Sequence, residues 1–266
     1  MNIMKISEEL KTSINVAFIA GDAIMKIYNE DFDVEIKENN SPLTIADKTA
    51  HYIINKTLNK FNLPILSEEG ELLSFELRKY WNRFWMIDPI DGTKEYISKN
   101  GEFTINIALI ENGHPVMGVV FAPALKELYF AESGLGSYKV ENIKSMKDFK
   151  FSNFIDLTKS KYPKIYTLVV SKSHMNDKTQ DYVNLLKNKH GNISTKAFGS
   201  SLKICKVAEG NAHCYPRFGP TMEWDTAAAH AVAYYSGCKI LQADKKTIIK
   251  YNKKNLLNPF FIVSHE

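Results

Sequence analysis

The stretch WMIDPIDGTKEY, residues 85–96, places an apolar run directly before two carboxylates and a glycine. The apolar residues 84–87 predict a short buried strand that ends at Asp88. A proline and a glycine then favour a tight turn, after which residues 93–95 can begin a helix. Asp88 and Asp91 therefore share one turn, where two carboxylates repel each other unless something holds them together.

The helix that follows this turn offers backbone N–H groups at its first residues. Such groups, together with the helix dipole, suit an anionic phosphate. A D-x-x-D-G pattern by itself, however, more often marks a turn in which aspartates occupy favoured positions and cap a helix. Taken alone, the motif leaves both interpretations open.

Two further segments carry acids at comparable places. Residues 66–70, LSEEG, end an apolar run with Glu68 and Glu69, and residues 223–230, EWDTAAAH, put Asp225 at the start of a buried helix. Each has an ordinary explanation, an exposed turn for the glutamates and an N-cap for Asp225. Considered together, carboxylates at strand ends and helix starts are the hard oxygen ligands that suit Mg²⁺. Two ions about 4 Å apart would remove the repulsion between them.

A metal site of this kind also needs an activated water. Asp47 lies in SPLTIADKTAH, residues 41–51, near the start of a predicted helix. With Thr44 as the N-cap, Asp47 completes a capping-box-like pair, and spacing alone favours this structural role. In the functional alternative, Asp47 orients the Thr93 hydroxyl, which in turn orients the attacking water.

The composition limits the classes of protein to which the chain can belong. The chain has 266 residues, 44% hydrophobic and 24% charged, which suits one large domain or two modest ones and excludes disordered and fibrous classes. A net charge of +4, carried by scattered lysines, fits a small polyanionic substrate and indicates no nucleic-acid partner. Three cysteines in no zinc pattern, no signal peptide and no apolar run of ~20 residues indicate a cytoplasmic protein without a transmembrane segment. Peripheral association with the inner face of the membrane and the oligomeric state are left open.

Helices and strands interleave without a strict βαβ period. We expect helices over 7–29, 44–58, 177–188, 200–210 and 225–237, with a breaker at 39–42. We expect a largely antiparallel set of strands, including a hairpin through an Asn-Gly turn, over 103–110, 116–122, 127–132 and 136–140, and further strands over 166–174 and 213–219. The polar region 141–163 is interpreted as a junction, which divides the chain into halves 1–150 and 151–266.

These segments resemble, nearly end to end, the lithium-sensitive, magnesium-dependent phosphatases of the inositol monophosphatase superfamily. The E-E, D-P-I-D-G-T and W-D segments are specific for the superfamily. The variant D-G-T-K-E-Y, together with GSSLK at 199–203 and YPRFGPT at 215–221, looks like the bacterial 3′(2′),5′-bisphosphate nucleotidase branch. Inositol monophosphatases typically have D-G-T-x-N-F there and lack the second segment.

The resemblance implies an α/β fold of layers α/β/α/β/α with mixed, largely antiparallel sheets in two halves. It implies hydrolysis of adenosine 3′,5′-bisphosphate (PAP) to AMP and phosphate by a metal-activated water, with two or three Mg²⁺ ions. The sulfated form PAPS is a second candidate substrate, and the role would lie in sulfur metabolism. Two rivals remain: an inositol or sugar monophosphatase on the same scaffold, and a non-catalytic, metal-dependent nucleotide sensor.

The resemblance also implies roles for individual residues. It implies metal binding by the following groups: Glu68, Asp88, the Ile90 carbonyl, Asp91 and Asp225. It assigns water activation to Asp47 and Thr93, and the phosphate cradle to the Gly92 and Thr93 backbone. The implied substrate contacts include these metal and cradle residues together with Gly199, Ser200, Ser201, Lys203 and Arg217. Arg217 could bind the second phosphate as a bidentate donor, although ordinary surface charge also explains it and Lys203. For His174 the sequence leaves two roles open, a cleft residue or a structural histidine.

Overall fold

The computed structural model describes residues 6–30, 33–36, 42–171, 176–244 and 246–265. Among these residues, the larger sheet has seven strands, which follow one another across the sheet in chain order. They are β3 (Ile65–Ser67), β4 (Arg83–Asp91), β5 (Thr104–Glu111), β6 (His114–Ala122), β7 (Glu127–Glu132), β8 (Gly136–Val140) and β9 (Ile155–Asp156). β3 pairs in parallel with β4, and each later neighbour pairs antiparallel, so the expected largely antiparallel sheet is confirmed.

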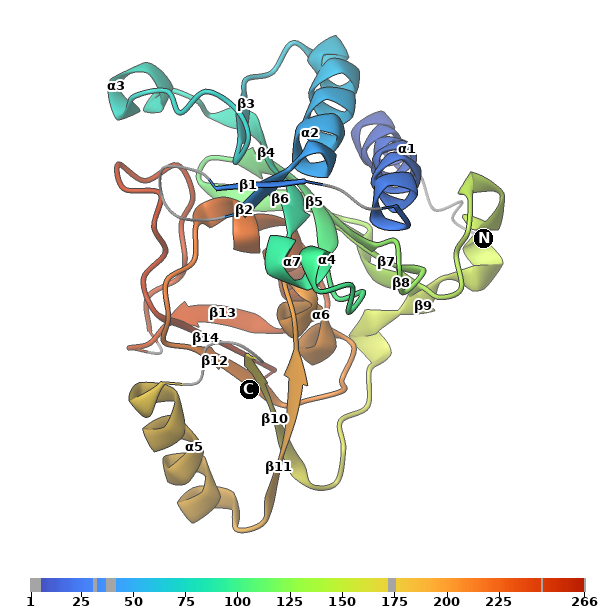
Figure 1. Cartoon of the computed structure of the whole chain (residues 1–266). Helices are drawn as coiled ribbons and strands as arrows, with labels where there is room; N and C mark the ends of the chain where they lie inside the picture. The colour runs from blue at the N-terminus through green and yellow to red at the C-terminus, as the bar shows by residue number, and fades with distance from the viewer. Residues whose placement is uncertain (1–5, 31–32, 37–41, 172–175, 245, 266) are drawn as a thin grey trace.

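The larger sheet is buried on both faces, and its strand sequences show why. Along β5, Ile105, Ile107 and Leu109 point into the core on one face, while Ala108 and Ile110 point into the core on the other. Because strand side chains alternate between faces, the continuous apolar run TINIALI indicates burial on both sides. Helices α1 (Glu8–Tyr28) and α2 (Ile45–Leu58) cover the first face (Figure 1).

The second face packs on α7 (Glu223–Tyr235), with α6 (Leu202–Ala208) beside it. The alanine-rich α7 sits close to β6, since a side chain at Gly118 would collide with the carbonyl of Ala228. This close packing fixes the N-terminal end of α7 against the end of β4, where the acidic residues gather.

A five-stranded sheet lies on the other side of α6 and α7, in the order β11-β10-β12-β14-β13. Its strands are β10 (Tyr166–Ser171), β11 (Ile193–Phe198), β12 (Cys214–Arg217), β13 (Lys239–Gln242) and β14 (Phe261–Ser264). Helix α5 (Asp177–His190) covers its outer face through Leu168, Val183 and Leu186. The five layers α/β/α/β/α, visible from top to bottom in Figure 1, confirm the expected fold class.

Short elements complete the described chain. They are the hairpin β1 (Val34–Ile36) and β2 (Pro42–Thr44), the helices α3 (Phe75–Arg78) and α4 (Thr93–Ile97), and the 3₁₀ turns η1 (Asn59–Phe61), η2 (Met146–Asp148), η3 (Phe151–Asn153) and η4 (Leu157–Lys159). In the part of the chain that the structure describes, no helix is long and apolar enough to cross a membrane. The cytoplasmic location stays a prediction of the sequence.

Most predicted elements are confirmed within a few residues, and several expectations need correction. Pro42 belongs to strand β2 rather than to a breaker, and residues 39–41 lie outside the described residues. The helix expected from Asp225 begins at Glu223. The expected junction contains β9, which pairs with β8 at the edge of the larger sheet. The division into halves at residue 150 stays a prediction.

Candidate active site

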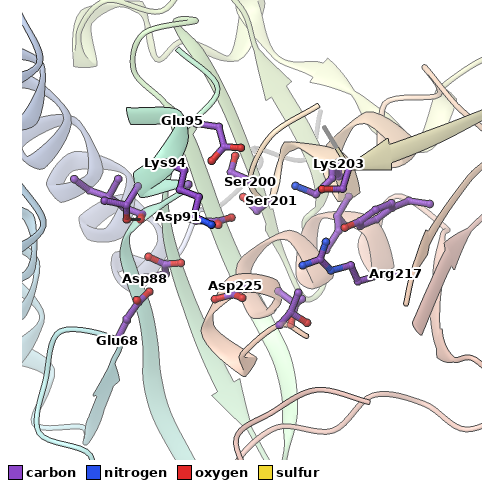
Figure 2. A pocket seen from close by; sticks show the side chains of 18 of the residues that line it. Glu68, Asp88, Asp91, Lys94, Glu95, Ser200, Ser201, Lys203, Arg217 and Asp225 are labelled. Carbon is purple, nitrogen blue, oxygen red and sulfur yellow. Dashed lines mark hydrogen bonds between the residues drawn. The ribbon is translucent and has the colours of Figure 1, made fainter. Parts of the chain in front are cut away.

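A cavity of about 270 Å³ opens where the C-terminal end of β4 meets the first turns of α6 and α7 (Figure 2). Segments far apart in sequence contribute its walls. The lining includes these predicted site residues: Glu68, Asp88, Ile90, Asp91, Gly92, Thr93, Ser200, Ser201, Lys203, Arg217 and Asp225. The structure therefore brings together most of the residues that the sequence singled out.

The DPIDG segment reaches this cavity through a distorted strand. β4 continues to Asp91, and its pairing with β5 shifts register between Asp88 and Asp91, so the predicted strand end at Asp88 is wrong. The bulge turns both carboxylates toward the cavity. Gly92 then adopts φ +89°, a left-handed conformation that favours glycine, and serves as the N-cap of α4.

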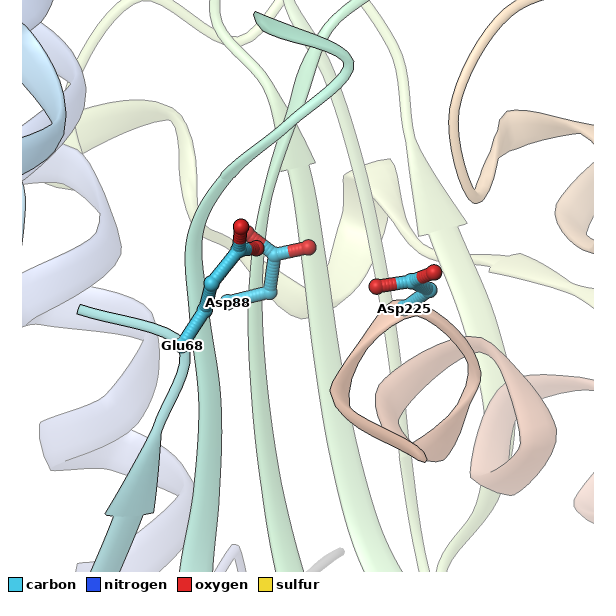
Figure 3. A group of neighbouring side chains, drawn as sticks. All are labelled: Glu68, Asp88 and Asp225. Carbon is cyan, nitrogen blue, oxygen red and sulfur yellow. The ribbon is translucent and has the colours of Figure 1, made fainter. Parts of the chain in front are cut away.

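Glu68, Asp88 and Asp225 form the centre of the acidic wall (Figure 3). One carboxylate oxygen from each lies within 4.8 Å of those of the other two. Glu68 directly follows β3, Asp88 lies within the neighbouring strand β4, and Asp225 reaches across from α7. Both oxygens of Asp88 are buried without a hydrogen-bond partner among the described residues. A buried carboxylate with neither partner nor solvent is costly, so this group is poised for a positive ligand.

Burial and mutual repulsion raise the pKa of each carboxyl in this wall. The pKa of Asp88 lies well above its ordinary value, because of burial first and then the charges of Glu68, Asp91 and Asp225. The pKa of Asp225 is also raised well above its ordinary value by burial and by Asp91 and Glu68. Burial raises the pKa of Asp91 to about 6, although Lys203 opposes the shift.

These residues fit a divalent metal. Four carboxylates share a small volume, one has no partner, and the oxygen-only donor set matches the preference of Mg²⁺. The Ile90 carbonyl, which the resemblance also assigns to the metal, belongs to a residue that lines the same cavity and lies 3.4 Å from Thr93 Oγ1. The metal-ligand roles of Glu68, Asp88, Ile90, Asp91 and Asp225 remain proposals supported by this arrangement.

Asp225 occupies a different helix position from the one expected. Met222 is the N-cap of α7, and Asp225, at the third helical position, accepts from the Met222 N–H through Oδ2 at 2.9 Å. The N-cap alternative for Asp225 is therefore wrong, although its carboxylate still helps to order the start of α7. Glu68 and Glu69 are partly buried rather than fully exposed, which weakens the exposed-turn alternative.

Asp47 caps a helix, and its second oxygen makes a contact that is compatible with the other role that the sequence left open. Its Oδ2 accepts from the Thr44 N–H and from Thr44 Oγ1, each at 2.7 Å, which completes a capping box at the start of α2. Its Oδ1 lies 3.4 Å from Thr93 Oγ1, which donates to it. One oxygen thus holds the helix end while the other faces the hydroxyl at the cavity.

The opposite wall is basic. Arg217 is only 9% exposed, so the surface-charge explanation does not apply to it. Its Nη2 donates to the Pro220 carbonyl at 2.8 Å, while Nε is buried without a partner among the described residues. Burial lowers the pKa of Lys203 to about 8, against the opposing effect of Asp91. Figure 2 shows Lys203 and Arg217 across the cavity from Glu68 and Asp88.

Some site residues differ from the expectation or were missed. Gly199 is not among the lining residues; its N–H instead donates to Glu102 Oε2 at 2.6 Å. His174 lies outside the described residues. Further lining residues had no place in the predicted site: Lys94, Glu95, Ser171, Ile204, Tyr215, Thr221, Thr226 and Phe261. The sequence feature closest to these missed residues was Lys94-Glu95, which directly follows D-G-T and puts two charged side chains three and four residues after Asp91.

The raised pKa values predict how stability depends on pH without metal. Since the native carboxyls hold protons more tightly than the unfolded chain, the free energy of unfolding should fall as pH rises from about 4 through about 6 and beyond. For Asp91 alone the loss is on the order of 2–3 kcal/mol. Urea unfolding from pH 4.5 to 8, in chelator and in Mg²⁺, measures this loss of stability. We expect Mg²⁺ to stabilise the protein more at pH 7.5 than at pH 5. Equal stabilisation at both pH values would contradict metal binding by these carboxylates.

Comparisons with known proteins agree with this geometry. Residues 5–265 match the model of the inositol monophosphatase family. The chain is 42% identical over 249 residues to the 3′(2′),5′-bisphosphate nucleotidase CysQ of Salmonella typhimurium, covering 92% of this chain and 95% of that one. CysQ of Escherichia coli K12 is 41% identical over the same shares.

Solved structures show the same relationship. The crystal structure of CysQ from Bacteroides thetaiotaomicron superposes with a TM-score of 0.89 at 44% identity, covering 99% of this chain and 100% of that one. An IMPase/NADP phosphatase, solved in complex with Mg²⁺ and phosphate, shares the fold with a TM-score of 0.75 at 22% identity, over 97% and 91% of the two chains. With a family match across nearly its whole length and relatives of this similarity, the chain belongs to the inositol monophosphatase family.

Proposed function

We propose that this protein is a Mg²⁺-dependent phosphatase that hydrolyses adenosine 3′,5′-bisphosphate to AMP and phosphate. The observation that carries the proposal is one cavity with an acidic wall around Asp88 and a basic wall formed by Lys203 and Arg217. The similarity to CysQ nucleotidases over 92% of the chain supports the same substrate class. Hydrolysis of PAPS and a role in sulfur metabolism follow from the same proposal.

In this proposal each wall of the cavity binds a different phosphate of the substrate. The acidic wall, with two or three Mg²⁺ ions, suits the phosphate that is cleaved. The second phosphate carries negative charge that the acidic wall would repel, and it matches a buried guanidinium with a free Nε–H. A bidentate contact to Arg217 would satisfy this donor and orient the nucleotide. An inositol monophosphate has no second phosphate to make this contact.

Bound Mg²⁺ supplies charge that neutralises the phosphoryl oxygens and activates water. Side chains and backbone groups of the protein orient the attacking water and the phosphoryl group. Asp47, held by Thr44, accepts a hydrogen bond from the Thr93 hydroxyl, so the Thr93 oxygen is left to accept a hydrogen bond from the attacking water. In this proposal the N–H groups of Gly92 and Thr93, at the start of α4, bind the phosphoryl oxygens, and the left-handed turn at Gly92 supports it.

Phosphate release from adenosine 3′,5′-bisphosphate and from inositol 1-phosphate, measured side by side, tests the proposal. Each assay is run with Mg²⁺, with chelator and with added Li⁺. We expect a strong preference for the nucleotide, loss of activity in chelator and inhibition by Li⁺. A preference for inositol phosphate would overturn the role given to Arg217, and release from neither substrate would favour a nucleotide sensor.

A further inference from the structure

A line of buried polar side chains crosses the apolar strand β5 and ends at Asp91. Thr104 and Asn106 are fully buried on β5, on the face that meets the segment between β11 and α6. Thr104 Oγ1 lies 2.8 Å from Ser201 Oγ, and Ser201 Oγ donates to Asn106 Oδ1 at 2.9 Å. Asn106 Nδ2 donates to Asp91 Oδ2 at 3.4 Å. None of these bonds is explained by the catalytic roles described above.

The chemistry of the groups fixes the direction of every bond in this line. An ionised Asp91 can only accept, so the NH₂ side of the Asn106 amide must face it. The Asn106 oxygen then accepts the single hydroxyl hydrogen of Ser201, which leaves Thr104 as the donor to Ser201. All donors therefore point toward the carboxylate, and each bond in such a chain polarises the next.

We propose that Asn106 is a positioning residue that holds the Asp91 carboxylate in its metal-binding orientation and couples it to the nucleotide-side segment at Ser201. The inference rests on the proposed function, in which Asp91 binds Mg²⁺ and Ser201 borders the substrate. Groups that hydrogen-bond to a metal ligand orient it, and their loss typically weakens metal binding or activity by about 10–100-fold. Here the effect should lie near tenfold, because the Ser201 backbone N–H also donates to Asp91.

This arrangement gives Asn106 a role that an apolar residue could not fill. On the same strand, Ile105 and Ile107 are buried in the core beneath α1 and α2, whereas Asn106 faces the opposite side. Its amide offers one acceptor and one donor in fixed geometry, which matches a hydroxyl on one side and a carboxylate on the other. A shift of Ser201 on nucleotide binding would therefore reach Asp91 through the rigid Asn106 amide as well as through the direct Ser201 backbone N–H.

The test is a double-mutant cycle on Mg²⁺ affinity, measured by calorimetry without nucleotide. Asn106→Leu keeps the size of the side chain and removes both hydrogen bonds, so we expect the Mg²⁺ dissociation constant to rise about tenfold. Ser201→Ala removes only the hydroxyl, and we expect a rise of about two- to threefold, since this hydroxyl acts on Asp91 through Asn106. The double variant should match Asn106→Leu, because the second change has nothing left to act through.

The control and the kinetics separate positioning from a general loss of packing. Ser137→Ala removes another buried hydrogen bond of the same sheet, from Ser137 Oγ to the Val232 carbonyl at 2.8 Å, and should leave Mg²⁺ affinity unchanged. In assays with saturating Mg²⁺, Asn106→Leu should raise KM for the bisphosphate while most of kcat returns.

Additive effects in the cycle would overturn the proposal. Unchanged Mg²⁺ affinity in Ser201→Ala would overturn it even if Asn106→Leu failed to fold. Because the cycle needs no substrate, its outcome is independent of the wild-type nucleotidase assay, so a failure of the proposed function is seen separately.

Discussion

Replacing Asp88 with Asn is expected to abolish phosphate release while leaving the metal-free protein at least as stable as the wild type at pH 7.5. Activity should fall on the order of 10³-fold or more, as when a group that stabilises developing charge is removed. The free energy of unfolding of the metal-free protein should instead stay the same or rise. Both Asp88 oxygens are buried without a partner, and burial and neighbouring acids raise its pKa, so the neutral amide removes a repulsion that the folded chain bears. Urea unfolding in chelator and a phosphate-release assay measure the two effects.

Glu209 provides the matched control for this substitution. It is also a buried carboxylate, but it is paired, with Lys139 at 2.8 Å and Lys206 at 3.0 Å. Glu209→Gln should lower the free energy of unfolding by about 1–3 kcal/mol, since Lys139 and Lys206 each lose one carboxylate partner but keep Glu127, and should leave Mg²⁺ affinity unchanged. If Asp88→Asn destabilised the metal-free protein as Glu209→Gln does, Asp88 would be a structural residue rather than a metal ligand.

The local features of the site could be predicted because each depends on a few neighbouring residues. Gly92 has the left-handed conformation that the turn required, and Asp47 completes the capping box that its spacing from Thr44 indicated. The approach of Glu68 to Asp225 could not be predicted from spacing, since it depends on how closely α7 packs on β6. That packing is decided by Gly118 against Ala228, a contact between distant segments.

The burial of Arg217 and the polar line at Asn106 illustrate a second limit. Arg217 lies in YPRFG, a short segment whose polarity alone suggests exposure, and only its place on β12 in the middle of the five-stranded sheet buries it. Thr104 and Asn106 do alternate with apolar residues in TINIALI, which could have indicated one polar face. Their partners Ser201 and Asp91, however, come from other parts of the chain. The strands β13 and β14 were missed because their pairing is likewise non-local.

Replacing Asp47 with Asn should lower kcat by about 10²–10⁴-fold and leave the Mg²⁺ dissociation constant nearly unchanged. The Asn oxygen can still accept from the Thr44 N–H, so the cap of α2 is largely kept. The amide nitrogen then faces Thr93 and donates where Asp47 accepted. With its lone pair engaged by this donor, the Thr93 hydroxyl turns its hydrogen toward the cavity and no longer accepts from the attacking water. Steady-state kinetics with saturating Mg²⁺, together with calorimetry, separate the two effects.

Asp148 supplies the same local chemistry away from the cavity, because it accepts from the Lys144 and Ser145 N–H groups at 2.9 and 3.1 Å in the capping box of η2. Asp148→Asn should therefore change stability only slightly and leave kcat unchanged. If kcat falls strongly in Asp47→Asn but is unchanged in Asp148→Asn, the effect is assigned to the carboxylate charge that faces Thr93. If Asp47→Asn lost stability but kept the wild-type kcat, capping would be the whole role of Asp47, and water activation would have to rest on other groups of the cavity.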